Sequence, residues 1–234
     1  MKARIITFKG IKFYNNNFFF VLSKLKNGGY LVAPAASALA NIFNDKDYYE
    51  ALKNSNIAIF DSGFFCILLR LLKKKKVKKF SGYLFLKQFL NQKKLKKKKI
   101  LLVDPSLRES KINLLFFKSK NFVNTKSYVA PIYKKKIIDM QLLNKIKKTK
   151  PNFIIINIGG EVQEVLAKFI YKNLNNKTII LCTGAAIGFM TGSQAPINDT
   201  VDKFYLGWLV RFVYSPKKYL FRVIKSISLI KLFF

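Results

Sequence analysis

Asp61 is the residue whose type and position best suit it to do chemistry. It lies between two apolar runs, residues 57–60 and 64–69, in a chain of 234 residues with only 11 Asp and Glu. A carboxylate among apolar side chains costs free energy unless it is paired or used, so Asp61 is a candidate general base. The competing interpretation is a helix N-cap, because an aspartate before a helix accepts hydrogen bonds from its first backbone N–H groups. Spacing alone favours the cap.

Glycine-rich turns offer a second kind of chemistry. Gly159 and Gly160 follow one apolar run, and a segment with three glycines, residues 184–192, follows another. Each leads into a predicted helix, so free N–H groups and the positive end of a helix dipole would suit a diphosphate. Glycine also ends strands and permits close packing, and this plainer interpretation stays open.

The residue types that the chain lacks exclude several classes of enzyme. There is no histidine, which removes Ser-His-Asp and Cys-His nucleophiles, HExxH zinc sites and histidine acid–base relays. The two cysteines, Cys66 and Cys182, lie in apolar surroundings and are too few for a disulfide scaffold or a metal cluster. They fit a reducing cytoplasm.

The elements that must position these residues alternate between short apolar runs and longer helical patterns. This alternation predicts an α/β fold, a Rossmann-like parallel sheet with helices on both faces, preceded by a hairpin. The carboxyl ends of parallel strands meet at one edge, so Asp61, Asp104 and the glycine turns should converge there. The predicted strands are residues 4–8, 11–14, 30–33, 57–60, 99–103, 127–130, 153–158 and 178–182. The predicted helices include residues 17–26, 36–43, 47–53, 140–148 and 162–174.

The C-terminal residues form a different kind of sequence. From Lys217 onward a helix of 100° per residue would place Tyr219, Leu220, Val223, Ile224, Ile227 and Ile230 on one side, and Lys217, Lys218, Arg222 and Lys225 on the other. We therefore expect a catalytic domain at residues 1–203 and a basic amphipathic appendage at residues 204–234 that lies on an anionic membrane surface. The alternative is an ordinary terminal helix packed on the core. No run of 18 apolar residues is present, which predicts a cytoplasmic protein, peripheral on the inner face of the cell membrane.

The charge is strongly basic, with 44 Lys and Arg giving a net charge of +33. Residues 73–99 contain 13 lysines and no acid. A face of one sign attracts polyanions or anionic membranes, so a nucleic-acid-binding protein is one hypothesis. AT-rich codon usage is a competing explanation for abundant Lys, Ile, Asn, Phe and Tyr. Only five arginines and no known binding module argue against a specific nucleic-acid partner.

Several segments, in order and at matching intervals, resemble the WecG/TagA/CpsF glycosyltransferase family. Residues 8–13 resemble its opening hairpin, 58–63 its "AD…DG" segment, 79–82 its Arg-Val-x-Gly, 151–164 its "PD…VGLGxPxQE", 184–196 its "G…F…AG…RAP" and 207–222 its "EWLxR…PxRLxxRY". The resemblance covers nearly the whole chain. Gln163-Glu164 and the block from Trp208 to Arg222 are its most specific parts.

This resemblance implies an inverting transfer of an N-acetylmannosamine-type sugar from a UDP-sugar donor to a polyprenyl-diphosphate-linked sugar acceptor. The product would enter cell-surface polysaccharide biosynthesis, and the reaction would use no metal and no other cofactor. Asp61 matches the family's proposed base. The resemblance also implies a nucleotide-sugar and diphosphate site made of Lys79, Gly159, Gly160, Gln163, Gln194, Arg211, Lys218 and Arg222.

The chain departs from the family pattern at positions that include Ala33, Ala35, Lys79, Glu161, Gln194, Gly207 and Lys218. Several of these exchanges remove a polar or bidentate contact, and a lysine does not reproduce the fork of an arginine. They support an alternative, a divergent and catalytically weak relative that binds a nucleotide sugar.

Overall fold

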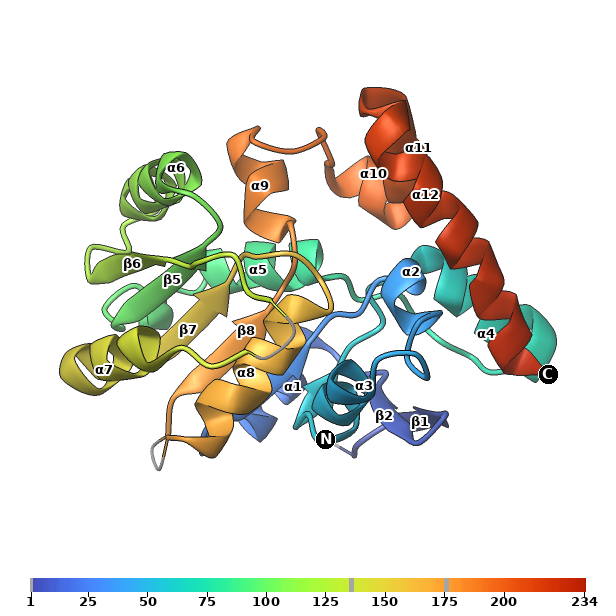
Figure 1. Cartoon of the computed structure of the whole chain (residues 1–234), viewed down its shortest axis with the longest axis horizontal. Coiled ribbons are helices and arrows are strands. Elements are labelled where there is room, and N and C mark those ends of the chain that lie inside the picture. Colours follow the sequence, from blue (N-terminus) through green and yellow to red (C-terminus); the bar gives the residue numbers. More distant parts are fainter. Residues whose placement is uncertain (1, 135–136, 175–176) are drawn as a thin grey trace.

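An eight-stranded sheet forms the centre of the computed structural model, which describes residues 2–134, 137–174 and 177–234. Its strand order is β1-β2-β4-β3-β8-β7-β5-β6 (Figure 1). The strands are β1 (Ile5–Phe8), β2 (Ile11–Tyr14), β3 (Gly29–Val32), β4 (Ile57–Ala58), β5 (Ile100–Asp104), β6 (Thr125–Val129), β7 (Phe153–Ile156) and β8 (Ile179–Cys182). Only the β1–β2 pair is antiparallel among these strands. The predicted α/β fold and its N-terminal hairpin are confirmed.

The hairpin turn shows why the chain reverses after Phe8. Lys9 and Gly10 both have positive φ, 46° and 78°. Two such residues make the turn whose twist matches that of the flanking strands. The pairing that follows puts Phe8 opposite Ile11.

Alternation along the strands divides the core into two layers. In β8, Ile179 and Leu181 pack on one face of the sheet, while Ile180 and Cys182 pack on the other. Because successive side chains point to opposite faces, strands covered on both sides read as unbroken apolar runs. Such runs made the central strands recognisable in the sequence.

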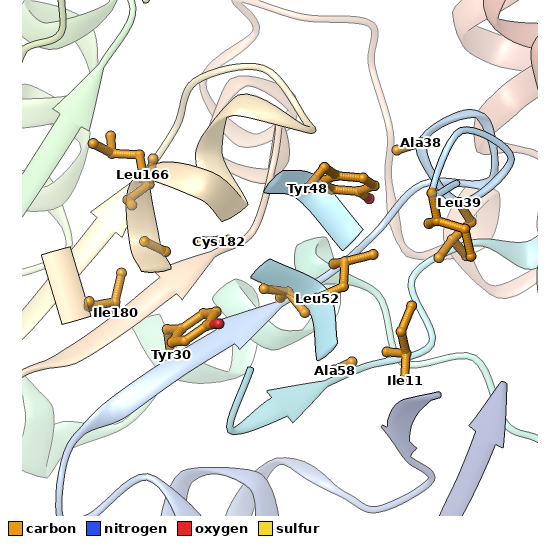
Figure 2. Packing of buried hydrophobic residues seen from close by; sticks show 14 of the residues in the cluster. Ile11, Tyr30, Ala38, Leu39, Tyr48, Leu52, Ala58, Leu166, Ile180 and Cys182 are labelled. Atoms are coloured by element: carbon orange, nitrogen blue, oxygen red, sulfur yellow. The ribbon is translucent and has the colours of Figure 1, made fainter. Parts of the chain in front are cut away.

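Helices cover both faces, as predicted. One face carries α1 (Phe18–Lys24), α5 (Gly82–Leu90), α6 (Leu107–Ser119) and α9 (Ala186–Thr191). The other carries α2 (Ala36–Leu39), α3 (Lys46–Lys53), α4 (Gly63–Lys73), α7 (Met140–Thr149) and α8 (Val162–Lys172). In Figure 2, Tyr48 and Leu52 of α3 and Leu166 of α8 lie over the strand residues Tyr30, Ile180 and Cys182.

Several predicted elements are shorter than expected. The strand predicted over residues 153–158 is β7, which ends at Ile156, and the helices predicted over residues 17–26 and 162–174 end at Lys24 and Lys172. The helix predicted over residues 36–43 is α2, which ends at Leu39, because Asn41, Ile42 and Asn44 bond to the carbonyl three residues before rather than four. The strand predicted over residues 57–60 is β4, which ends at Ala58, and the N–H of Asp61 turns back to the carbonyl of Ile59.

The C-terminal residues form α10 (Asp199–Lys203), α11 (Gly207–Tyr214), α12 (Pro216–Ile227) and the 3-10 helix η2 (Ser228–Phe233). Helix α12 packs on α2 and α11 and runs along one side of the molecule to the C-terminus (Figure 1). Among the described helices, none combines the length and apolar character needed to cross a bilayer.

Candidate active site

A cleft of about 550 Å³ opens at the carboxyl ends of β3, β4, β5, β7 and β8. This is the edge at which the sequence placed its candidate residues. Its walls include Ala33, Asp61, Asn157, Gly159, Gly160 and Gly184 from the turns after the strands. Helices α9, α11 and α12 close the opposite side with Phe189, Arg211, Arg222 and Lys225.

Asp61 lies half-buried on the cleft wall, and it does not cap the helix that follows it. Ser62 is the N-cap of α4, and its hydroxyl accepts the N–H of Phe65. The N-cap interpretation that the spacing favoured is therefore wrong for this helix. Asp61 Oδ1 instead accepts the N–H of Gly82, the first residue of α5, at 2.8 Å.

The surroundings of Asp61 pull its pKa in two directions. Burial raises the pKa of the carboxyl above its usual 3.8, and the charge of Asp202 adds to the rise. The Gly82 N–H and the positive charges of Lys79 and Arg211 oppose it. A carboxylate with a raised pKa is a better proton acceptor than a free aspartate.

Lys79 belongs to an ionic network that ties α10 to the cleft. Its Nζ lies 2.5 Å from Asp202 Oδ1 and 2.8 Å from the Asp202 carbonyl oxygen. The hydroxyl of Ser81 donates to the other Asp202 oxygen at 2.9 Å. Lys79 therefore stands beside Asp61 with its charge already shared with Asp202.

Arg211 brings an incompletely bonded positive charge into the cleft. Its guanidinium lies 5.0 Å from the ring centre of Phe189, and its buried Nε has no hydrogen-bond partner among the described residues. Burial lowers the pKa of Arg211, while the charge of Asp61 raises it. An anion entering the cleft would satisfy both the charge and the orphan N–H.

Helix α12 turns its basic side toward the cleft and part of its apolar side outward. Arg222 and Lys225 line the cleft, whereas Leu220, Ile224 and Ile227 are more than half exposed. Lys218 is in the helix, but its side chain lies outside the described residues. The amphipathic helix expected from Lys217 onward is present up to Ile227.

The glycine turn after β7 is open to the cleft. A Cβ added at Gly159 or Gly160 would meet nothing within 4 Å. Glu161, which follows, has a positive φ of 72° and bonds to Lys225 Nζ at 2.9 Å. The N-terminus of α8 therefore faces the cleft, with a carboxylate of this chain beside it.

Two glutamines of the predicted site have structural bonds. Gln163 Oε1 accepts the N–H of Gly184 at 3.1 Å, and its Nε2 donates to Glu164 at 2.9 Å. Gln194 Oε1 accepts from the Tyr219 hydroxyl at 3.4 Å, joining the loop after α9 to α12. Both side chains line the cleft.

One cleft is lined by all the predicted site residues whose side chains the structure describes: Asp61, Lys79, Gly159, Gly160, Gln163, Gln194, Arg211 and Arg222. A family model, Glycosyl transferase WecG/TagA/CpsF family, matches residues 11–234 of the chain. The protein belongs to the WecG/TagA/CpsF family. A comparison with curated proteins finds no match.

Membership of the WecG/TagA/CpsF family makes the protein a glycosyltransferase of cell-surface polysaccharide synthesis. It also implies, in general terms, a nucleotide-sugar donor and a lipid-linked acceptor. Among the described residues, no group of three or more Cys, Asp or Glu could hold a metal ion. That the reaction uses no metal stays a prediction.

Sequence reasoning missed three residues that line the cleft: Asp202, Asn113 and Asn157. Asp202 lies 141 positions after Asp61, and only the fold shows that it meets Lys79 and Ser81. Asp104 was visible as a polar residue after a strand, but nothing marked its partners Asn113 and Asn157. No local pattern signals such pairings.

Proposed function

We propose that the protein transfers an N-acetylmannosamine-type sugar from a UDP-sugar to a polyprenyl-diphosphate-linked acceptor, with inversion and with Asp61 as general base. The observation that carries the proposal is the place of Asp61 on a wall shared by two cavities. One is the polar cleft, and the other is a pocket of about 270 Å³ lined by Phe64, Trp208 and Ile227. A base between a nucleotide site and an apolar site suits a donor and a lipid-linked acceptor.

On the acceptor side, the Asp61 carboxylate takes the proton of the attacking hydroxyl. The hydroxyl oxygen then forms a bond to the anomeric carbon of the donor sugar, from the face opposite the leaving group. The raised pKa of Asp61 and its fixed bond to Gly82 hold the carboxylate ready for this step. The apolar pocket between α4 and α12 receives the lipid end.

On the donor side, the bond between the anomeric carbon and the UDP oxygen breaks, and negative charge grows on the diphosphate. Arg211 and Arg222 supply positive charge, and the turn at Gly159 and Gly160 supplies N–H groups. Lys79, Gln163 and Gln194 complete the wall around the nucleotide sugar. The orphan Nε of Arg211 is satisfied by a phosphate oxygen.

We also propose that residues 204–234 form an appendage that docks on the inner face of the cell membrane, next to a catalytic domain of residues 1–203. The outward apolar residues of α12 and the neighbouring Lys217 support this arrangement, since apolar burial and anionic lipid attraction act together. A membrane-bound acceptor then reaches Asp61 directly from the bilayer.

The first experiment compares Asp61→Asn with the unchanged protein in a transfer assay with UDP-N-acetylmannosamine and a short-chain prenyl-diphosphate sugar. We expect turnover to fall about 10²- to 10⁴-fold, because the proton acceptor is lost. UDP affinity, measured by calorimetry, should stay within about threefold because Asp61 does not hold the diphosphate. The exposed Asp47→Asn is the matched control. Normal turnover in Asp61→Asn would remove Asp61 from the role of base.

The alternative of a catalytically weak relative also has an observation in its favour. Two basic residues of the cleft are engaged by carboxylates of the chain itself, Lys79 by Asp202 and Lys225 by Glu161. A variant that combines Ala33→Thr, Ala35→Asn and Gln194→Arg restores the family pattern. If this alternative holds, the triple variant should gain transfer activity over the unchanged chain, and no gain would count against it.

A further inference from the structure

The end of helix α4 and the loop after it, residues 74–78, carry a concentration of positive charge outside the cleft. Five positively charged side chains line a surface hollow of about 460 Å³ there: Arg70, Lys74, Lys75, Lys76 and Lys78. Within the part of the chain that the structure describes, the ion pairs involve Lys79, Lys87 and Lys225, and no carboxylate pairs with these five residues. Residues 74–78, here called the lysine loop, are therefore matched to a negatively charged partner outside the chain.

The lysine loop is held in one position through its backbone. Asn15, which follows β2, accepts the N–H of Lys78 at 3.0 Å and donates to the carbonyl oxygen of Lys76 at 2.9 Å. The Arg70 guanidinium donates to the carbonyl oxygen of Val77 at 2.6 Å, and the Val77 side chain is buried. The lysine side chains thus project from an anchored backbone, so binding a partner costs less ordering of the chain than it would for a free segment.

Apolar side chains are exposed directly before these lysines. Ile67, Leu71 and Leu72 of α4 are all exposed, and 71% of Leu71 is open to solvent. A nucleic acid would neutralise the lysines through its phosphates but would leave the leucines uncovered. An anionic bilayer takes up both, because the leucines enter the boundary of the acyl chains while the lysines stay among the headgroups. The combination favours a membrane over RNA.

Helix α4 also connects the lysine loop with the apolar pocket beside Asp61. Its first residues, Gly63 and Phe64, line that pocket, and so does Ile227 of α12. The 3-10 helix η2 packs on α4, so α4 and the end of α12 lie together on one side of the molecule (Figure 1). A bilayer in contact with both helices would lie close to the pocket that receives the lipid end of the acceptor.

We propose that α4 and the lysine loop form a second membrane contact, in which Leu71 and Leu72 enter the headgroup boundary and the lysines bind the phosphates of anionic phospholipids. This contact belongs to residues 1–203 and is separate from the outward apolar side of α12. It rests on the proposed function in one respect, because the bilayer is taken to deliver the acceptor to the pocket between α4 and α12. Contacts on two helices fix how the molecule is oriented on the bilayer, whereas one helix alone leaves it free to roll.

The test is sedimentation of the full chain with vesicles of phosphatidylglycerol and phosphatidylcholine at about 0.1 M salt. The quadruple variant of Lys74, Lys75, Lys76 and Lys78 to Gln should bind about tenfold more weakly or worse, because each lysine near an anionic surface adds to the attraction. The double variant Leu71→Gln and Leu72→Gln should bind about fivefold more weakly or worse, because two apolar side chains no longer insert.

The matched control removes the same charge elsewhere. It replaces four exposed lysines of the same acid-free run by Gln: Lys93, Lys94, Lys97 and Lys98. These lysines precede β5, which three strands separate from β4 in the sheet. The control should bind vesicles within about threefold of the unchanged protein, because screening confines each charge to about 10 Å. UDP affinity should be unchanged in all three variants, since none of the replaced side chains lines the cleft.

Equal weakening by the two quadruple variants would mean that net charge alone attracts the vesicles, and it would overturn this inference. Full vesicle binding by the leucine variant would overturn it as well, because α4 would then not touch the bilayer. If the lysine-loop variant lost binding to a random RNA oligonucleotide and kept vesicle binding, the loop would be assigned to nucleic acid instead. An unchanged protein that binds vesicles as expected but does not bind UDP would leave the membrane contact standing and overturn the proposed transfer. Normal transfer to a soluble acceptor without vesicle binding would do the reverse.

Discussion

At the scale of single residues, the proposed base Asp61 has a half-buried carboxyl whose pKa is raised by burial and lowered by the charges of Lys79 and Arg211. Since burial raises its pKa, the proton acceptor of the free enzyme should be lost at a higher pH than for an ordinary aspartate. We expect kcat/KM to fall about tenfold per pH unit on the acid side, with a midpoint above 3.8. A pH–rate profile of the transfer reaction measures this.

Lys79 provides the internal check on that profile, because its charge lowers the pKa of Asp61. Lys79→Met should move the acid limb to still higher pH. Lys87→Met is the matched control, since Lys87 pairs with the exposed Asp199 and is not one of the charges that act on Asp61. A limb that moves to lower pH in Lys79→Met would contradict the assignment of the limb to Asp61.

Asp104 should make the stability of the protein depend on pH. Burial raises its pKa from 3.8 to about 6, although the bonds from Asn157 and Asn113 oppose the rise. The folded state therefore holds the proton more tightly than the unfolded chain, and stability from this group is lost as pH rises from about 4 to about 6. Asp104→Asn should match the unchanged protein at pH 4 and exceed its free energy of unfolding by about 1–3 kcal/mol at pH 8.

Urea unfolding at the two pH values tests this expectation. Asp139→Asn should give no such gain, because Asp139 accepts from Tyr128, Tyr133 and the N–H of Leu142. An Asp104→Asn variant that is less stable at pH 8 than at pH 4, relative to the unchanged chain, would refute the prediction. A gain would mean that the unchanged protein keeps a destabilising carboxylate behind the cleft residues Asn113 and Asn157, as functional sites commonly do.

Sequence reasoning located some of these residues because local order was enough. Asp61 follows an apolar strand and Gly159 precedes a helix, and the carboxyl ends of parallel strands must meet. Lys79 was placed in the site, but its partner Asp202 was not, because an ion pair between residues 123 positions apart leaves no local pattern. The fully buried Asp104 likewise gave no sign of its two asparagine partners, one of which lies 53 positions away.

At the scale of elements, the central strands were predictable and their ends were not. Unbroken apolar runs mark strands that are covered on both faces. Where a strand stops depends on its neighbour: β4 pairs with β3 only through Ile57 and Ala58, and the chain then leaves the sheet toward Asp61. Propensity within residues 57–60 carries no information on that neighbour, so the predicted strand was too long.

Helix α12 is the element that should decide membrane association. Leu220, Ile224 and Ile227 are exposed on its outer side, while Arg222 and Lys225 face the cleft. The triple variant Leu220→Gln, Ile224→Gln and Ile227→Gln should bind vesicles of phosphatidylglycerol and phosphatidylcholine at least tenfold more weakly, because each apolar side chain contributes to insertion. Vesicle sedimentation measures the bound fraction.

The control for the triple variant is UDP affinity, which should not change, because the three side chains lie outside the nucleotide cleft. Leu115→Gln is the matched control, because Leu115 is an exposed leucine in another helix, α6. This substitution should leave vesicle binding intact. Vesicle binding that is unaffected by the triple variant would show that another surface, such as the lysines of residues 73–79, carries the attraction.

At the scale of the whole molecule, the two ends of the chain are packed into one core. Phe233, near the C-terminus, is 3% exposed, and its ring centre lies 4.8 Å from that of Phe8 at the end of β1. It also lies 6.2 Å from the ring of Phe65 in α4. Residues 204–234 are thus anchored at their far end, which fixes the position of α12 over the cleft.

Phe233→Ala should therefore lower the free energy of unfolding by about 3–4 kcal/mol, since a buried phenylalanine leaves a cavity among rings that cannot close on it. Phe234→Ala is the matched control one residue later: its side chain is 90% exposed, so the change should stay within about 0.5 kcal/mol. Urea unfolding gives both values.

Because Arg222 and Lys225 reach the cleft from the helix that Phe233 anchors, Phe233→Ala should also weaken UDP binding in the fraction that remains folded. Equal stability of the two variants would mean that the C-terminal turn does not hold residues 204–234 in place, and that α12 is kept over the cleft by the Glu161–Lys225 ion pair instead.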